Sequence, residues 1–534
     1  MKKNKNDNLW EFREAHKMRS FERVVLLALV IAGIISLIKF GDWWFRKEHI
    51  GNFWLFIILS LFFWYSMVRV ILSWINYMNI KKPLPVIPEE GLNVAIFTTS
   101  YAGEPLEMIV KTLQACRNVT YPHKTYLLDN TGDPSFKEAA ENNGAVWIES
   151  VGLEGAKAGK INNALKQTNE DYILILDPDH IPFPNFLDNT LGFFQDEKIG
   201  FVQVSQAYYN QYRSFTAKGA AEQTYLFYGP TQMGLNGLGC SVAIGANCTF
   251  RRKALESIGG HAVGLAEDLL TSIRIHAKGW TSKYNPVVVS RGLVPEDFDS
   301  FCKQQLKWSR GVFEILFVEL PKVFGKLSGW QKFSYFAIGT YYLIGVLSFF
   351  FILLPFLFFL TGILPAQMPF TDFLINGSYL IVISTLIYLY TQRWLSHPEI
   401  ERGFHWRGMI LKYATWPVFF LGFLLAVVNI DIPYIPTPKK AKISFITPFV
   451  RPHIIYIALF LISITIVIIN RRYFILENEL IASVEKTWGM IGFAFLAFIM
   501  SILSVFAAWS SKNLKEEDPW EKISLNQIKT SINN

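Results

Sequence analysis

Cysteine and charged residues are both scarce in this chain of 534 residues. The four cysteines, Cys116, Cys240, Cys248 and Cys302, are scattered without the paired spacing of a metal site. This pattern argues against a disulfide framework and a zinc site, and it fits a reducing cytosolic compartment. Only 18% of the residues are charged, which is below the share typical of soluble globular domains.

Other signals are also missing. The chain has no long-period repeat, no low-complexity linker and no basic, aromatic module for nucleic acid. Its net charge of +8 therefore points to basic loops beside anionic lipid, and we expect no nucleic-acid partner. The first apolar run follows a charged segment and lacks a small-residue cleavage site, so we expect a membrane anchor and not a removable signal.

Hydrophobic residues make up 51% of the chain and aromatic residues 16%, which predicts membrane spans. Six apolar runs approach the length of a spanning helix, about 20 residues. They are residues 24–38, 53–71, 336–364, 373–390, 454–469 and 488–509.

A seventh apolar run, residues 413–430, is long enough to span, but its flanks argue against a full crossing. A crossing would place the basic run 439–442 outside, against the tendency of basic loops to stay in the cytosol. We therefore predict that 413–430 lies in the interface or enters the membrane and returns, with a full span as the alternative. The same topology places the arginine pair 471–472 outside, which counts against it.

From about Leu92 to Gly311 the pattern changes to short apolar runs that alternate with polar, periodic segments. Such alternation predicts βαβ units and a mainly parallel, helix-covered sheet. About 220 residues are enough for one α/β domain with its own core. The predicted strands are 93–98, 125–128, 146–148, 172–176 and 200–204.

Two carboxylates, Asp177 and Asp179, follow the apolar run 172–176. That run is typical of a strand buried on both faces, and open α/β sheets bind ligands at the C-terminal ends of such strands. Carboxylates two residues apart suit one hard divalent cation that shares its other positions with substrate phosphates. A solvated turn is the alternative for this motif taken alone.

Polar residues also end the first two predicted strands. Thr99, Ser100 and Glu104 offer hydroxyls and an acid that suit a base and a ribose, although Glu104 also fits the first turn of a helix. Asp129 alone would fit an Asx turn. Because Asp129 and Asp177 both end strands of one sheet, a shared nucleotide site becomes plausible.

Two further residues stand where helices begin. Lys157 lies in a small-residue loop that a phosphate could approach, although the Gly-Lys-Ser/Thr ending of a P-loop is absent and a solvated lysine fits equally. Asp268 is either a helix-cap acid or a general base. Further along, Gln304 and Trp308 suit either interfacial anchoring or the binding of a sugar ring.

The order of these motifs resembles the processive, membrane-embedded glycosyltransferases of family 2, such as cellulose synthases, with hyaluronan and chitin synthases as relatives. The family pattern comprises a strand-end Asp, Asp-x-Asp, a Thr-Glu-Asp-like motif and then Gln-x-x-Arg-Trp, with a Lys-Ala-Gly run between the first two. The corresponding residues here, in chain order, are Asp129, Lys157-Ala158-Gly159, Asp177-Pro178-Asp179, Ala266-Glu267-Asp268 and Gln304-Gln305-Leu306-Lys307-Trp308.

The resemblance implies roles for the donor side of the site. Glu104 and Asp129, with Thr99 or Ser100, would hold uridine, and Lys157 would meet the diphosphate. Asp177 would contact the nucleotide, and Asp177 and Asp179 together would bind the metal, Mg²⁺ or Mn²⁺.

On the acceptor side, the resemblance implies that Asp268 deprotonates the acceptor hydroxyl and that Trp308 stacks on the terminal sugar, with Glu267 and Gln304 beside it. Lys307 departs from the family arginine; it keeps a charge for the donor phosphates but loses the bidentate fork, for which Arg310 could compensate. A gating-like loop is expected at Tyr434, Thr437 and Lys439.

The expected fold is therefore α/β plus membrane α: a cytosolic GT-A-like, Rossmann-like domain inserted between transmembrane helices, with interfacial helices. The expected segments are a cytosolic N-terminus (1–22), two spans (23–80), the glycosyltransferase domain (92–312), interfacial helices (313–335), two spans (336–392), interfacial helices with the gating-like loop (393–448), two spans (449–510) and a cytosolic tail (511–534).

The implied function is processive, inverting polymerisation of a UDP-sugar, first of all UDP-glucose, into a β-linked polysaccharide that leaves through the protein's own channel. This places the protein in a plasma membrane, the inner one in bacteria, in contact with lipid and the growing polymer. The sequence does not determine whether accessory export subunits carry the polymer onward. The alternatives are transfer of one sugar to a membrane lipid, and a transporter or structural subunit with an inactive nucleotide fold.

Overall fold

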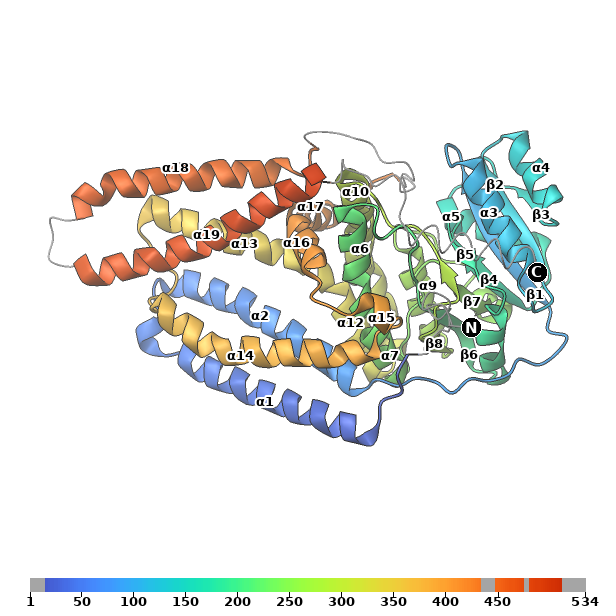
Figure 1. The fold of residues 1–534 in the computed structure, drawn as a ribbon, viewed down its shortest axis with the longest axis horizontal. Helices are drawn as coiled ribbons and strands as arrows, with labels where there is room; N and C mark the ends of the chain where they lie inside the picture. Colours follow the sequence, from blue (N-terminus) through green and yellow to red (C-terminus); the bar gives the residue numbers. More distant parts are fainter. Residues whose placement is uncertain (1–14, 434–446, 475–479, 511–534) are drawn as a thin grey trace, which may run out of the picture.

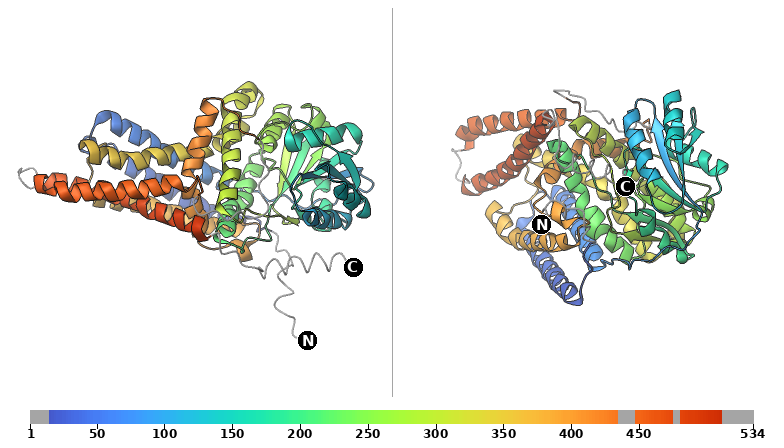
Figure 2. Two further views of the ribbon diagram at one scale, coloured as in Figure 1. Left: turned by 90° about the horizontal axis from the view of Figure 1, so that it is seen from above. Right: turned by 45° about the vertical axis from the view of Figure 1, so that its right-hand side comes forward.

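The computed structural model describes residues 15–433, 447–474 and 480–510. An α/β domain occupies one end of the molecule, and long, roughly parallel helices occupy the other (Figure 1). Two further views, one from above and one turned by 45°, also show the two parts as distinct, with shorter helices between them (Figure 2). The polar functional residues predicted from the sequence therefore belong to a domain that sits beside a helix bundle.

The α/β domain is built on a seven-stranded sheet in the order β3-β2-β1-β4-β7-β6-β8. Only β7 runs antiparallel to its neighbours, so the prediction of a mainly parallel sheet is confirmed. β7 and β8 are strands that the sequence pattern did not predict. The bounds are β1 Val94–Tyr101, β2 Lys124–Asn130, β3 Val146–Glu149, β4 Tyr172–Leu176, β6 Ile199–Val204, β7 Cys248–Arg251 and β8 Thr281–Asn285.

Both faces of the sheet are buried, which explains the continuous apolar runs of its central strands. Ile96 and Leu174 are register partners in one core, and Phe97 and Ile175 are partners in the core on the opposite face. Successive side chains of a strand point to opposite faces, so β1 and β4 supply both layers. The covering helices include α3 (Leu106–Arg117), α4 (Pro134–Asn142), α5 (Ala156–Gln167), α8 (Arg252–Glu256) and α9 (Glu267–Ala277).

Five helices are long and apolar enough to cross a membrane within the ranges that the structure describes. They are α1 (Ser20–Trp44), α2 (Phe53–Met78), the continuous stretch Gly329–Thr361, the stretch Phe370–Trp394 and the part Gly489–Ser510 of α19 (Leu480–Ser510). They correspond to five of the six predicted spans. The sixth, residues 454–469, lies in α18 (Arg451–Phe474), whose described apolar part, Arg451–Ile466, is shorter.

The third of these helices starts earlier than predicted. It begins with α12 (Gly329–Gly339) and continues through η8 (Tyr341–Leu343) into α13 (Ile344–Thr361), whereas the sequence predicted a start at residue 336. The reason is local: the Ser328 hydroxyl accepts from the backbone N–H of Gln331, whose side chain accepts from the Ser328 N–H. This capping box satisfies two donors of the first turn and fixes the start of the helix.

The ambiguous run 413–430 forms neither one straight helix nor a loop. α16 (Trp406–Ala414) and α17 (Trp416–Val427) meet at an angle of 42°. A bent pair of this kind fits a broken span as well as a segment that enters the membrane and returns. The interfacial or re-entrant assignment therefore stays a prediction.

Close backbone approaches join the α/β domain to the bundle. A Cβ at Gly234 of α7 (Gln232–Gly237) would lie 2.2 Å from the carbonyl oxygen of Asn76, at the end of α2. A Cβ at Gly422 of α17 would lie 2.3 Å from Oγ of Ser309 on α10 (Phe298–Glu314). Because only glycine allows such packing, these contacts hold the domain directly against one helix that precedes it and one that follows it.

Candidate active site

Three parallel strands bring the predicted polar residues to one edge of the sheet. Ser100 at the end of β1 is the register partner of Asp129 on β2. Thr98 of β1 is the partner of Leu176, after which β4 delivers Asp177. The carboxyl ends of these strands therefore coincide, and open α/β sheets bind ligands at such an edge.

Asp129 is held in one orientation by three donors. Its Oδ1 accepts from Ser100 Oγ at 2.6 Å and from the Thr131 N–H at 3.0 Å, and its Oδ2 accepts from Trp147 Nε1 at 3.1 Å. Of the two hydroxyls proposed for this loop, Ser100 reaches Asp129. Thr99 is the adjacent residue of β1, so its side chain belongs to the opposite face of the sheet, where it is 2% exposed.

The loop after β1 is tied to helix α5 by a residue that the sequence analysis passed over. Lys160 donates to the backbone oxygen of Ser100 at 2.5 Å, and its Nζ lies 3.0 Å from the ring centroid of Tyr101. Glu104 accepts from the Tyr101 N–H at 2.9 Å. The motif Lys157-Ala158-Gly159 drew attention away from Lys160, although a second lysine one turn later on the same helix was a visible signal.

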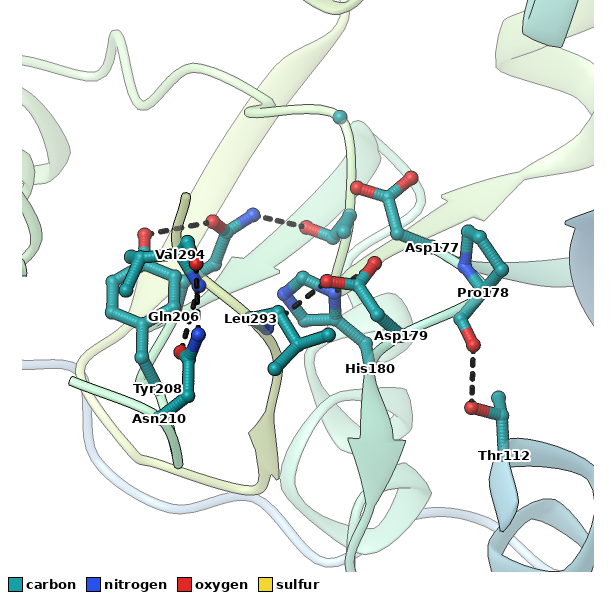
Figure 3. A network of polar contacts seen from close by, with 12 residues as sticks. Thr112, Asp177, Pro178, Asp179, His180, Gln206, Tyr208, Asn210, Leu293 and Val294 are labelled. Carbon is teal, nitrogen blue, oxygen red and sulfur yellow. Dashed lines mark hydrogen bonds and ion pairs between the residues drawn. The ribbon is translucent and has the colours of Figure 1, made fainter. Parts of the chain in front are cut away.

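The residues after β4 form a compact group of potential metal ligands. One ligand atom each from Asp177, Asp179 and His180 lies within 4.8 Å of the others. Figure 3 shows the carboxylates of Asp177 and Asp179 with the imidazole of His180 beside Asp179. Two carboxylates and an imidazole form a donor set that suits Mn²⁺, and the oxygens alone suit Mg²⁺. His180, one residue beyond the motif, was not predicted as part of the site.

The backbone around this group is fixed from two sides. Thr112 Oγ1 donates to the Pro178 carbonyl at 2.7 Å, and the Leu293 N–H donates to Asp179 Oδ2 at 3.0 Å (Figure 3). A Cβ at Gly292 would lie 2.4 Å from Cε1 of His180. The strand pair β5 (Ile181–Pro182) and β9 (Ser290–Arg291) brings this second segment alongside.

Lys157 connects the metal-ligand group to the opposite wall of the site. Its ammonium is 5% exposed and donates to Asp177 Oδ1 and to the carbonyl oxygen of Gly245. Burial lowers the pKa of Lys157, but Asp177 and Glu267 outweigh burial, so the pKa is raised overall. The same lysine, with His180, keeps the pKa of Asp177 below its usual range despite burial.

A second acidic pair, Glu267 and Asp268, begins α9, and both carboxylates interact electrostatically with Lys157. Burial and the neighbouring carboxylate raise the pKa of Glu267, and burial raises the pKa of Asp268 although its Oδ1 accepts from the Leu269 N–H at 2.8 Å. Gly245 has a φ of +81°, and a Cβ there would lie 3.4 Å from Asp268 Oδ2. The missing side chain therefore leaves the carboxylate room toward Lys157.

Helix α10 presents its motif residues beside this pair. Trp308 is 38% exposed, Gln304 is partly buried, and the charge of Lys307 lowers the pKa of Glu267. The suggestion that Arg310 compensates for Lys307 at a phosphate is wrong. Its guanidinium is 1% exposed and donates to the carbonyl oxygen of Ile430 at 3.0 Å and to Glu314 at 2.8 Å.

Arg310 therefore ties α10 to Ile430 and Asp431, just after α17, whereas Lys307, three residues earlier on α10, acts on Glu267. The predicted gating-like residues Tyr434, Thr437 and Lys439 lie outside the described residues.

Fold and site together define a class. A mixed GT-A-like sheet carries an acid pair at the end of β4, a lysine and a further acid pair beside a helix bundle. The sequence profile of the family described as glycosyl transferase family group 2 matches residues 172–507, and the chain belongs to this family. The predicted fold class is thus confirmed, as is the predicted membership of glycosyltransferase family 2.

Individual relatives refine this assignment. The chain is 30% identical over 359 residues to a cellulose synthase catalytic subunit (UDP-forming) from Komagataeibacter sucrofermentans, covering 64% of this chain and 47% of that protein. It is 25% identical over 500 residues to the corresponding subunit of Pseudomonas fluorescens, covering 88% and 65%. The chain thus spans about half to two thirds of the length of these curated relatives.

A solved structure shares the fold. A mannosyltransferase from Pyrobaculum calidifontis, in complex with GDP-Man and Mn²⁺, superposes with a TM-score of 0.50 at 16% identity. The match covers 71% of this chain and 100% of that one. At this identity the similarity establishes the architecture and leaves donor, acceptor and product to be inferred from the site.

Proposed function

We propose that the protein is a processive, inverting glycosyltransferase that adds sugar from a UDP-sugar, first of all UDP-glucose, to a β-linked glucan. One observation carries the proposal: the buried Lys157 donates to Asp177 and also interacts electrostatically with Glu267 and Asp268. A leaving diphosphate and a reacting hydroxyl would need just such charges on either side of the bond that is transferred. The similarity to cellulose synthase catalytic subunits (UDP-forming) supports UDP as the nucleotide.

The donor would lie along the sheet edge. Its base and ribose would meet Asp129 and Glu104, and its diphosphate would meet Lys157 and Lys307. Asp177 and Asp179, with His180 beside them, would hold a divalent cation, Mg²⁺ or Mn²⁺. When bound, the cation would neutralise negative charge that builds up on the diphosphate.

Asp268 would act as the general base that takes the proton of the acceptor hydroxyl. A carboxylate whose pKa is raised by burial holds a proton more tightly, so it removes one more effectively at neutral pH than an exposed aspartate would. A single base, without a carboxylate nucleophile, means direct displacement at the anomeric carbon. The linkage formed is then inverted, so an α-linked donor gives a β-linked product.

The acceptor would approach from α10. Trp308, which is 38% exposed, offers an aromatic plane to the terminal sugar, and Gln304 and Glu267 offer partners for its hydroxyls. Beyond α10 lie the apolar helices, packed directly on the domain through α17. The growing chain would leave among these helices, which requires a multi-pass membrane protein with its catalytic domain on the cytosolic side.

The decisive experiment is product analysis with the purified full-length protein. Labelled UDP-glucose with Mg²⁺ or Mn²⁺ is expected to give long, alkali-resistant β-glucan together with free UDP, and linkage analysis identifies the polymer. Products one sugar longer than a lipid acceptor would replace processivity by lipid glycosylation. Absence of UDP release with every donor and metal would point to a catalytically inactive subunit.

A further inference from the structure

Lys160 is a buried cation to which the proposed mechanism gives no task. It lies in α5 and is 1% exposed. Its ammonium donates to the backbone oxygen of Ser100 at 2.5 Å and lies 3.0 Å from the ring centroid of Tyr101. Burying a lysine is unfavourable unless its charge is compensated, so this position calls for an explanation.

The two residues that Lys160 contacts, Ser100 and Tyr101, each donate a hydrogen bond to a carboxylate. Ser100 Oγ donates to Asp129 at 2.6 Å, and the Tyr101 N–H donates to Glu104 at 2.9 Å. One ammonium therefore fixes the short segment from which both carboxylates are oriented. These are the carboxylates that the proposed function assigns to the nucleoside.

Opposing effects bring the pKa of Lys160 close to neutral pH. Burial lowers its pKa to about 7, Glu104 and Asp129 oppose this change, and Lys157 on the same helix adds to it. These acids come from the loop after β1 and from the end of β2, the elements against which this part of α5 packs. An anionic diphosphate at Lys157 would offset the repulsion between the two lysines and favour the protonated form.

We propose that Lys160 is a positioning residue of the nucleotide pocket, which in its protonated form fixes Ser100 and Tyr101 so that Asp129 and Glu104 receive the nucleoside diphosphate. The inference rests on the proposed function, because it takes the donor to be a nucleoside diphosphate sugar. It adds that donor binding is coupled to protonation of a residue that does not touch the reacting atoms.

The test measures UDP binding to the full-length protein with Mg²⁺ by calorimetry. Wild-type affinity is expected to fall by about tenfold between about pH 6.5 and about pH 9, with proton uptake on binding in the window around neutral pH. In K160R, whose guanidinium stays charged, this fall is expected to disappear. In K160M, affinity at both pH values is expected to be about tenfold below that of the wild type at about pH 6.5, and therefore close to that of the wild type at about pH 9, the effect of one lost hydrogen bond to a charged group.

Steady-state kinetics separates positioning from chemistry. K160M is expected to raise KM for the UDP-sugar while kcat at saturating donor stays within about twofold, because the lost interaction would be made equally in the ground and transition states. The matched control is K166M, which removes an exposed lysine of the same helix and should bind UDP as the wild type does.

The outcomes distinguish the two levels of inference. Wild-type UDP affinity in K160M, or the same pH dependence in K160R as in the wild type, overturns the role of Lys160 while leaving the proposed function intact. Failure of the wild type to bind UDP, with Mg²⁺ present at any of these pH values, overturns the proposed function itself. A merely structural lysine would lower thermal stability in K160M without changing the pH profile in K160R.

Discussion

The two halves of the candidate site treat their carboxylates differently. At the ends of β1 and β2, Asp129 accepts three hydrogen bonds and is 1% exposed. At the start of α9, burial raises the pKa values of Glu267 and Asp268, which interact with Lys157 as Asp177 does.

The first arrangement is rigid and suits recognition, since a fixed acceptor discriminates by geometry. The second arrangement leaves the buried charge of Glu267 and Asp268 incompletely compensated, which suits proton transfer. A binding half and a reacting half should therefore respond to substitution in different ways.

The largest effect is expected at the reacting half, from D268N. Asparagine keeps the shape of the side chain but cannot accept the proton, so kcat should fall by about 10³-fold. The Kd for UDP, measured by calorimetry, should change little because in the proposed arrangement the nucleoside meets Asp129 and Glu104 and not Asp268. The control D171N alters an exposed aspartate just before β4 and should leave both quantities unchanged. If D268N retained most of its turnover, Asp268 would not be the base.

The metal-ligand group should respond next, through G292A. A Cβ at residue 292 would overlap the imidazole of His180 at 2.4 Å, and the displaced ring should weaken Mn²⁺ binding by about 10- to 100-fold. Electron paramagnetic resonance titration with UDP present measures this affinity directly. G325A is the matched control, because a Cβ at Gly325 meets open space. Unchanged Mn²⁺ affinity in G292A would remove His180 from the metal site.

A smaller effect is expected on the acceptor side, from W308A. Loss of an aromatic face for the terminal sugar should reduce polymer length and overall rate by about tenfold. The Kd for UDP should be unaffected, since the donor does not contact this ring in the proposed arrangement. Gel-permeation analysis of labelled product measures chain length, and W308F should restore most of it. Long polymer from W308A would argue that the acceptor follows another path.

The smallest effect concerns stability, through E267Q. The raised pKa of Glu267, about 7 against 4.5 for the free side chain, means that the folded state binds more protons than the unfolded state between these values. Wild-type stability therefore falls as pH rises from about 4.5 to about 7. E267Q removes this loss, so its Tm should exceed that of the wild type by a few degrees at about pH 8 and match it at about pH 4. A lower Tm at about pH 8 would show that the charged form of Glu267 is stabilising.

Much of the fold followed from the sequence because local periodicity encodes it. The strands β1 and β4 were predicted from apolar runs, and the carboxylates at their ends were predicted from position along those runs. β7 escaped because its alternation of apolar and polar residues covers only Cys248–Arg251, and β8 escaped because Thr281–Asn285 gives no alternating or continuous apolar pattern. They are strands because neighbouring strands supply their hydrogen bonds.

The site residues also divide into those that the sequence could predict and those that it could not. Asp177 and Asp179 could be predicted because both requirements, an apolar strand and acids at its end, lie within ten consecutive residues. Arg310 was misassigned because its partner Ile430 lies 120 residues further along the chain. His180 and Lys160 were overlooked because their importance depends on Gly292 and on Ser100, which the chain folds against them.

The amino-acid order alone determined which segments are apolar enough for lipid, which form the sheet, and where its acids stand, because these properties depend on neighbours in the chain. Only the folded chain decided that Lys157 interacts with both acid groups, that Ser100 and not Thr99 meets Asp129, and that Arg310 serves the helices. Burial and charge act through space, and the distances that govern them arise when remote segments pack together.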